Sequence, residues 1–372
     1  MPHSTHDLKI KARELGFNLV GITRAEPSPT LDAYLRWIEA GMHGTMGYLA
    51  RPDRQARRRD LTTILPGASS MVIVGVDYRT STIPEHVLND PARGRIAAYA
   101  WGLDYHDIMT PRLEELGEWL QPDTSRVYVD TGAILERSHA QQAGLGFVGK
   151  NTMLIHPRRG SDFFVGEILT TIEFDDYDTP HRPTMCGTCT RCLSACPTDA
   201  FPEPYVLDAR RCISYHTIEN KGWIDRDLRS RFGNWVFGCD ICQDVCPFQR
   251  FSPPSSETSF FPRDTDRAAP KLLDLLALNE ETFKKRFHGS TISRIKRERL
   301  VRNACIAAGN WGHEDAIPAL RKLLDDASSL VRGHAVWALG CSAGDRMHHQ
   351  LTALYDREAD PFVRQEIEAV IG

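Results

Sequence analysis

At 372 residues the chain is too long for one ordinary hydrophobic core, which favours an enzyme of two or three domains. Hydrophobic residues make up 41% and charged residues 25% of a chain with a formal net charge of -4, a composition that argues against a disordered or membrane protein. The first residues contain no apolar run of signal-peptide or membrane length and no twin arginine, so we expect a cytoplasmic protein.

Residues 1–173 alternate helical and strand-like patterns. Apolar residues recur at helical spacing near the N-terminus and again over 107–120. Short β-branched, apolar runs that favour strands occupy 17–23, 71–78 and 126–132. The pattern predicts an N-terminal domain of the α/β or α+β class.

A polar, proline-containing linker over 174–184 leads into a segment rich in cysteine. Eight of the ten cysteines fall within 61 residues of a chain without a signal peptide, which favours metal ligation over disulfides. The first run has the spacing C-x2-C-x2-C-x3-C-P of a bacterial ferredoxin, in which three thiolates hold one 4Fe-4S cluster and the fourth reaches a second. Its members are Cys186, Cys189, Cys192 and Cys196.

A second run, Cys239, Cys242 and Cys246, repeats the last three positions of this motif, and Cys212 can supply the missing one. Ferredoxin pairing then assigns Cys186, Cys189, Cys192 and Cys246 to one cluster. It assigns Cys196, Cys212, Cys239 and Cys242 to the other. Zinc is the alternative, but a zinc ribbon normally shows two separated cysteine pairs. We therefore predict a ferredoxin-like module over 174–266 that holds two 4Fe-4S clusters.

After a second polar stretch at 251–266 the sequence repeats itself. Val301, Val331 and Val363 occupy matched positions, 30 and 32 residues apart, within segments of small and apolar residues. This period is typical of HEAT-type helix pairs, so we predict a helical repeat domain over 267–372. Cys305 and Cys341 lie in these helices, where we expect them to be inert core residues.

Several motifs resemble, in order, those of the epoxyqueuosine reductases. They are LPGASSMVIVGVDY, YAWGLDYH, VDTGAILERSHAQQAGLGFVGKN, the cysteine module, CISYHTIENKG and the C-terminal repeats. The resemblance implies a cobalamin in the N-terminal domain and reduction of epoxyqueuosine to queuosine in the anticodon loop of tRNA. Two rivals are a reductive dehalogenase, usually exported and without such repeats, and a purely electron-transferring iron-sulfur protein.

The resemblance also implies site residues. Asp130, at the end of a predicted strand, matches the proposed proton donor of the family, although an aspartate at this place can also simply cap a turn. The motif D-x-H-x-x-G is absent because Met109 replaces its glycine, so no histidine is expected on the cobalt. The expected cofactor contacts are Arg58, Tyr105, His106, Asp130, Gly149, Lys150 and Asn151.

Residues 284–302 carry eight Lys or Arg against one acidic residue, Glu298. A basic strip can bind RNA phosphates, although charge runs are usually solvated helix faces. With the resemblance we predict tRNA contacts from Lys296, Arg297, Arg299 and Arg302. The expected partners are tRNA carrying epoxyqueuosine and an external low-potential electron donor. We expect a monomer that does not bind membranes.

Overall fold

The computed structural model describes residues 4–80, 83–121 and 123–372. The chain forms two compact units, each assembled from separate segments. Unit 1 comprises residues 1–81, 103–210 and 240–261, and unit 2 comprises 82–102, 211–239 and 262–372. The segment 174–266, predicted to form the cluster module, contributes residues to both units.

Unit 1 is built on a four-stranded sheet in the order β1-β2-β7-β4. Its strands are β1 (Leu19–Arg24), β2 (Ser70–Asp77), β7 (Phe163–Thr170) and β4 (Ser125–Tyr128), and every pairing is antiparallel. All residues of β2 are buried, as its apolar β-branched run predicts. The predicted mixed class of helices and strands is confirmed, and the sheet proves to be antiparallel.

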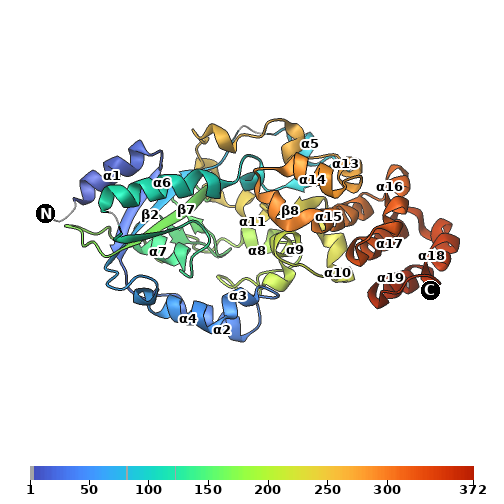
Figure 1. Ribbon diagram of the computed structural model, residues 1–372, viewed down its shortest axis with the longest axis horizontal. Coiled ribbons are helices and arrows are strands. Elements are labelled where there is room, and N and C mark those ends of the chain that lie inside the picture. Colours follow the sequence, from blue (N-terminus) through green and yellow to red (C-terminus); the bar gives the residue numbers. More distant parts are fainter. Residues whose placement is uncertain (1–3, 81–82, 122) are drawn as a thin grey trace. The chain divides into compact units, whose positions relative to one another are not determined.

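Helices cover both faces of this sheet (Figure 1). A Cβ added at Gly166 of β7 would lie 2.7 Å from Leu113 of α6 (Tyr105–Leu120), so this side of β7 faces α6. Neighbouring residues of a strand point to opposite faces. Phe163, Val165 and Leu169 therefore point away from α6, and they join an apolar cluster with residues of α7 (Glu136–Gln142).

The remaining helices and strands of unit 1 are short. They are α1 (Thr5–Glu14), α2 (Leu31–Glu39), α3 (Gly47–Ala50), α4 (Pro52–Arg59), β5 (Phe147–Val148), β6 (Leu154–Ile155), α8 (Arg191–Ala195) and α11 (Ile241–Asp244). Helix α1 begins at Ser4, whose hydroxyl caps the first turn, and it buries Leu8 and Ala12 as its helical spacing predicts.

Unit 2 contains the C-terminal helical repeats. The three matched segments are α15 (Lys296–Trp311), α17 (Ser329–Ala343) and α19 (Pro361–Ile371). The matched valines of these helices are completely buried, which confirms the predicted repeat. Gly309 lets α15 approach α17 closely, because a Cβ there would lie 2.4 Å from the Trp337 ring. Cys305 is buried as expected, whereas Cys341 is exposed and is not a core residue.

The other elements of unit 2 surround these helices or precede them in the chain. They are α5 (Glu85–Leu88), β3 (Arg95–Ile96), α9 (Ile213–Ile218), α10 (Arg226–Arg229), β8 (Trp235–Phe237), α12 (Thr265–Ala268), α13 (Leu272–Leu276), α14 (Glu280–Phe287), α16 (Ile317–Lys322) and α18 (His348–Tyr355). Strands β3 and β8 form a parallel pair. Within the described residues no helix is long and apolar enough to cross a membrane.

Candidate active site and cluster ligands

Asp130 lies in the loop that follows β4, two residues beyond the end of the strand at Tyr128. Its backbone has a φ of 56°, in the left-handed region that aspartate tolerates better than most residues. Its side chain is exposed, and the Tyr105 hydroxyl donates a hydrogen bond of 3.0 Å to its Oδ2 atom. The structure thus presents this carboxyl to solvent on a constrained loop.

Tyr105 opens α6, and its ring stacks on Phe164 of β7 with centroids 4.1 Å apart. The preceding residue, Asp104, caps the helix by accepting a hydrogen bond from the His106 backbone. His106 Nδ1 also lies 2.7 Å from Asp104 Oδ1. The structure therefore brings Tyr105 to Asp130, and it pairs His106 with the helix cap.

Two further carboxyl groups lie close to Asp130, and the sequence analysis missed both. Glu167 of β7 is completely buried, and neither of its carboxylate oxygens has a hydrogen-bond partner among the described residues. Glu136 is half-buried at the start of α7. A lone glutamate inside the apolar run FFVGEILT was the available signal, because a buried carboxyl is costly without a function or a partner.

The surroundings of the two glutamates raise the pKa of each. Burial raises the pKa of Glu136 to about 8, and the charge of Asp130 adds to this, while Arg137 and Arg58 oppose it. Burial also raises the pKa of Glu167 well above its usual value, with further contributions from Glu136 and Asp130. Both glutamates are therefore protonated near neutral pH.

Arg58, on α4, is buried rather than solvated. Its guanidinium lies over the Tyr34 ring, 5.0 Å from the centroid, and its Nε atom has no hydrogen-bond partner among the described residues. On the same helix, Arg54 donates to the Thr131 carbonyl oxygen at 3.2 Å. Helix α4 thus contributes a buried donor and an anchor for the loop that carries Asp130.

The glycine-rich loop at 149–151 contacts the cysteine segment. Lys150 Nζ donates to the carbonyl oxygens of Gly187 and Cys189, at 2.8 and 3.0 Å, and Asn151 Nδ2 donates to that of Cys242 at 3.0 Å. A Cβ on Gly149 would lie 2.5 Å from Ile155 Cδ1. Lys150 and Asn151 therefore position the cysteine-bearing loops, and their predicted contact with a cofactor stays a prediction.

Cys186, Cys189, Cys192 and Cys246 of unit 1 are the predicted ligands of one cluster, and the described residues show no group of three or more such side chains placed to hold a metal ion. Burial raises the pKa of Cys192, and the nearby Cys186 and Cys246 add to the shift. Burial likewise raises the pKa of Cys246, where Cys186 and Cys189 contribute. Cys192 lies in α8 and Cys242 in α11, and these two helices pack on each other. The assignment of the four cysteines to one cluster therefore rests on their spacing.

The other four predicted ligands belong to different parts of the chain. Cys196 and Cys242 belong to unit 1, whereas Cys212 and Cys239 belong to unit 2. The Cys196 sulfur accepts a hydrogen bond from the Ala200 backbone at 3.3 Å. All eight cysteines are half-buried. The assignment of this second set to one cluster remains a prediction.

The basic strip requires a correction. Arg302 is completely buried in unit 2, where it donates to the carbonyl oxygens of His216, Asn220 and Gly222. Arg299 is buried and likewise donates to backbone carbonyl oxygens. Both guanidinium groups are used in holding α15 against α9 and the loop that follows it, so the prediction that they contact RNA is wrong.

The other basic residues of the strip also differ in burial and pairing. Arg297 is half-buried and pairs with Asp326 at 2.6 Å. Lys284, Lys285 and Lys296 are exposed. Only some of the charged groups in this run are therefore available to a partner. The sequence alone does not show which cations the fold buries or pairs.

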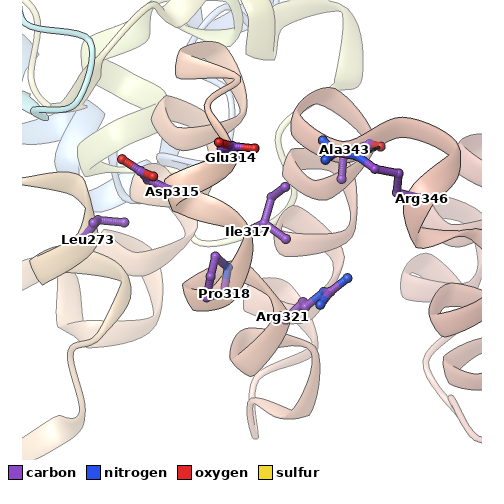
Figure 2. Close-up of a pocket in the computed structure, with 8 residues that line it drawn as sticks. All are labelled: Leu273, Glu314, Asp315, Ile317, Pro318, Arg321, Ala343 and Arg346. Atoms are coloured by element: carbon purple, nitrogen blue, oxygen red, sulfur yellow. Dashed lines mark hydrogen bonds between the residues drawn. The ribbon is translucent and has the colours of Figure 1, made fainter.

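Unit 2 also has a groove of about 550 Å³ in its helical repeats (Figure 2). Acidic Glu314 and Asp315 and basic Arg321 and Arg346 contribute to its lining. Both Arg321 Nε and Nη2 lie 3.3 Å from Met347 Sδ. None of the predicted site residues lines this groove.

Comparison with family models assigns three segments. Residues 58–131 match "Epoxyqueuosine reductase QueG, DUF1730", 185–249 match "4Fe-4S double cluster binding domain" and 296–372 match "HEAT repeats". An epoxyqueuosine reductase of Xanthomonas campestris is 42% identical over 341 residues, covering 89% of this chain and 94% of the relative. The chain belongs to the epoxyqueuosine reductase family. It is an oxidoreductase with a double 4Fe-4S cluster domain.

Other epoxyqueuosine reductases agree with this placement. The Escherichia coli enzyme is 39% identical, with 88% of this chain and 86% of the relative covered. A crystal structure of an epoxyqueuosine reductase with an epoxyqueuosine-modified tRNA stem loop matches with 32% identity and a TM-score of 0.90, covering 98% and 97% of the two chains. A Bacillus subtilis structure, described with its catalytic aspartate loop swung out of the active site, matches with a TM-score of 0.89 and 31% identity over the same shares.

Proposed function

We propose that this chain reduces epoxyqueuosine to queuosine in the anticodon loop of tRNA, with cobalamin at the reaction centre and electrons delivered through two 4Fe-4S clusters. The exposed carboxyl of Asp130, bonded to the Tyr105 hydroxyl, carries the proposal. Loss of the epoxide oxygen as water requires proton donation, and a carboxyl on a constrained loop can provide it. Family membership supplies the reaction class.

The residues around Asp130 suit a cobalamin. Amide side chains surround the corrin ring, and the buried Arg58 Nε, without a partner among the described residues, can donate to such a group. Arg58, Tyr105 and Asp130 would hold the cofactor, while Lys150 and Asn151 would act on it only through the cysteine loops they bind. The bound cofactor would supply a metal centre able to pass electrons to the epoxide.

The cysteine module supports the supply of those electrons. Cys186, Cys189, Cys192 and Cys246 would hold one cluster, and Cys196, Cys212, Cys239 and Cys242 the other. Ferredoxin-type clusters reach potentials low enough for such a reduction, provided that an external low-potential donor reduces them. Since the chain is expected to act on tRNA, we place this reaction in the cytosol.

For RNA binding, Lys296 stays a predicted contact, and the exposed Lys284 and Lys285 take the place of the arginines. Lys284 and Lys285 lie on α14 and Lys296 opens α15, so all three belong to unit 2 and are accessible to phosphates. Such contacts give affinity without reading the base, whose recognition would belong to the cofactor site.

Turnover of a defined substrate tests the proposal. Protein reconstituted anaerobically with iron, sulfide and cobalamin is incubated with a low-potential reductant and tRNA carrying epoxyqueuosine. Mass spectrometry of the digested nucleosides should show the loss of one oxygen atom and the appearance of queuosine. Protein with full cluster and cobalamin content that leaves the epoxide intact, while a known epoxyqueuosine reductase converts it, would contradict the proposal.

A further inference from the structure

Glu167 occupies an unusual position in the sheet. It lies on the same face of β7 as Phe163, Val165 and Leu169, because every second residue of a strand points to the same side. Its side chain therefore points into the apolar cluster on the α7 side. Its neighbours across the sheet are Ile73 of β2 and Tyr128 of β4. None of these positions offers an opposite charge, and neither Glu167 oxygen has a hydrogen-bond partner among the described residues. Burial of this kind stabilises the neutral acid.

The loop that carries Asp130 passes directly over this buried acid. A Cβ on Gly132 would lie 3.2 Å from Glu167 Oε1 and 3.0 Å from Tyr128 Cγ, so a larger residue here would crowd both side chains. Glu136 follows four residues later, at the start of α7, and it interacts electrostatically with both Asp130 and Glu167. The exposure of the three carboxyls rises from completely buried Glu167 through half-buried Glu136 to exposed Asp130.

Glu136 and Glu167 have different charged residues around them. Glu167 faces Glu136 and Asp130, and Glu136 faces in addition Arg58 of α4 and Arg137 of α7. The arginines favour the ionised form of Glu136, and burial opposes them. Glu136 can therefore lose a proton and regain it, whereas Glu167 has no cation of this kind to stabilise its ionised form.

The proposed reaction needs more protons than one aspartate holds. Conversion of an epoxide to an alkene takes two electrons and two protons, breaks both C–O bonds and releases water. Asp130 gives its proton to the oxygen as the first C–O bond breaks and is left as a carboxylate. The second proton must reach the same oxygen after Asp130 has given up its own, and acidic groups of the protein beside Asp130 can supply it.

We propose that the Glu136–Glu167 pair is the proton reserve of this site, and that Glu136 reprotonates Asp130 within each turnover. After the product leaves, Glu136 takes up a proton from solvent through its exposed part. Glu167, which is buried beneath the loop, keeps a proton within the pair. The electrons come from the external donor through the clusters. The inference rests on the proposed function and adds to it the source of the second proton.

The first test is kinetic. Glu136→Gln keeps the size of the side chain and removes its proton, so kcat for tRNA carrying epoxyqueuosine should fall by about 100-fold with KM unchanged. The decline of kcat at alkaline pH, expected near the Glu136 pKa of about 8 in the parent, should disappear. Imidazolium buffer should restore turnover of this variant in proportion to its concentration. The matched control is Glu173→Gln, an exposed glutamate three residues beyond β7, which should behave as the parent.

The second test needs no turnover. Infrared spectra of the anaerobically purified full chain at neutral pH should show protonated carboxyl bands that Glu136→Gln and Glu167→Gln each diminish, whereas Glu173→Gln does not. An inactive parent protein that nonetheless shows these bands would contradict the proposed function and leave the proton reserve standing. An active parent whose kcat, pH profile and buffer response are unchanged in Glu136→Gln would overturn the reserve itself, as would spectra without the bands.

Discussion

The raised pKa of Glu136 makes the stability of unit 1 depend on pH. Its value is about 8 in the folded chain against 4.5 for an ordinary glutamate, so the folded state binds the proton more tightly than the unfolded state. A group of this kind contributes most to stability below pH 4.5, and the contribution is lost as the pH rises toward about 8. Glu136→Gln cannot ionise, so its stability should fall less with pH than that of the parent.

The size of the effect follows from linkage. Well between the two pKa values each pH unit changes the free energy of unfolding by about 1.4 kcal/mol, and the slope falls to half at the folded pKa, which gives about 2.3 kcal/mol between about pH 6 and about pH 8. Since Glu136 is half-buried and coupled to Glu167, we expect about 1.5 kcal/mol. For a unit of about 200 residues this corresponds to about 3 to 6 °C in the melting temperature.

Thermal unfolding of the anaerobic protein should be followed at both pH values through hydrogen exchange of the β7 amides, which report on unit 1. The parent and Glu173→Gln should lose melting temperature in parallel as the pH rises, and Glu136→Gln should lose less by the amount above. Equal losses in all three proteins would show that Glu136 is already ionised in the folded state, and the electrostatic account of this site would be wrong.

Three further variants test the rest of the site. Asparagine also tolerates the left-handed backbone, so Asp130→Asn should keep its cluster and cobalamin content while turnover falls by about two to four orders of magnitude. Near-normal turnover would show that Asp130 only caps a turn. Cys246→Ala should remove about half of the iron from a chain with two 4Fe-4S clusters, and unchanged iron and sulfide counts would refute the assigned ligand set. Changing Lys284, Lys285 and Lys296 to Glu should weaken tRNA binding and flatten its dependence on salt without changing iron content, and an unaltered salt slope would locate the RNA elsewhere.

The sequence determined the features that depend on local spacing. The runs around Cys186 and Cys246 identified the cluster module because cluster ligation fixes the number of residues between thiolates. The valines at 301, 331 and 363 identified the repeats, since helices that stack must bury the same face each time. The strands over 17–23 and 71–78 were visible for the same reason, as their side chains are apolar where the sheet is buried.

Tertiary structure decided which charged side chains lie close together and which are buried or paired inside the fold. Arg302 and Arg297 read alike in a basic run, but the fold buries one among backbone carbonyls and pairs the other with Asp326. Glu167 and Glu136 are far apart in sequence and become neighbours only because β7 lies beside β4 and beneath α7. A charge acquires its environment from long-range contacts that spacing does not encode, so the carboxyl pair behind Asp130 could be found only in the folded chain.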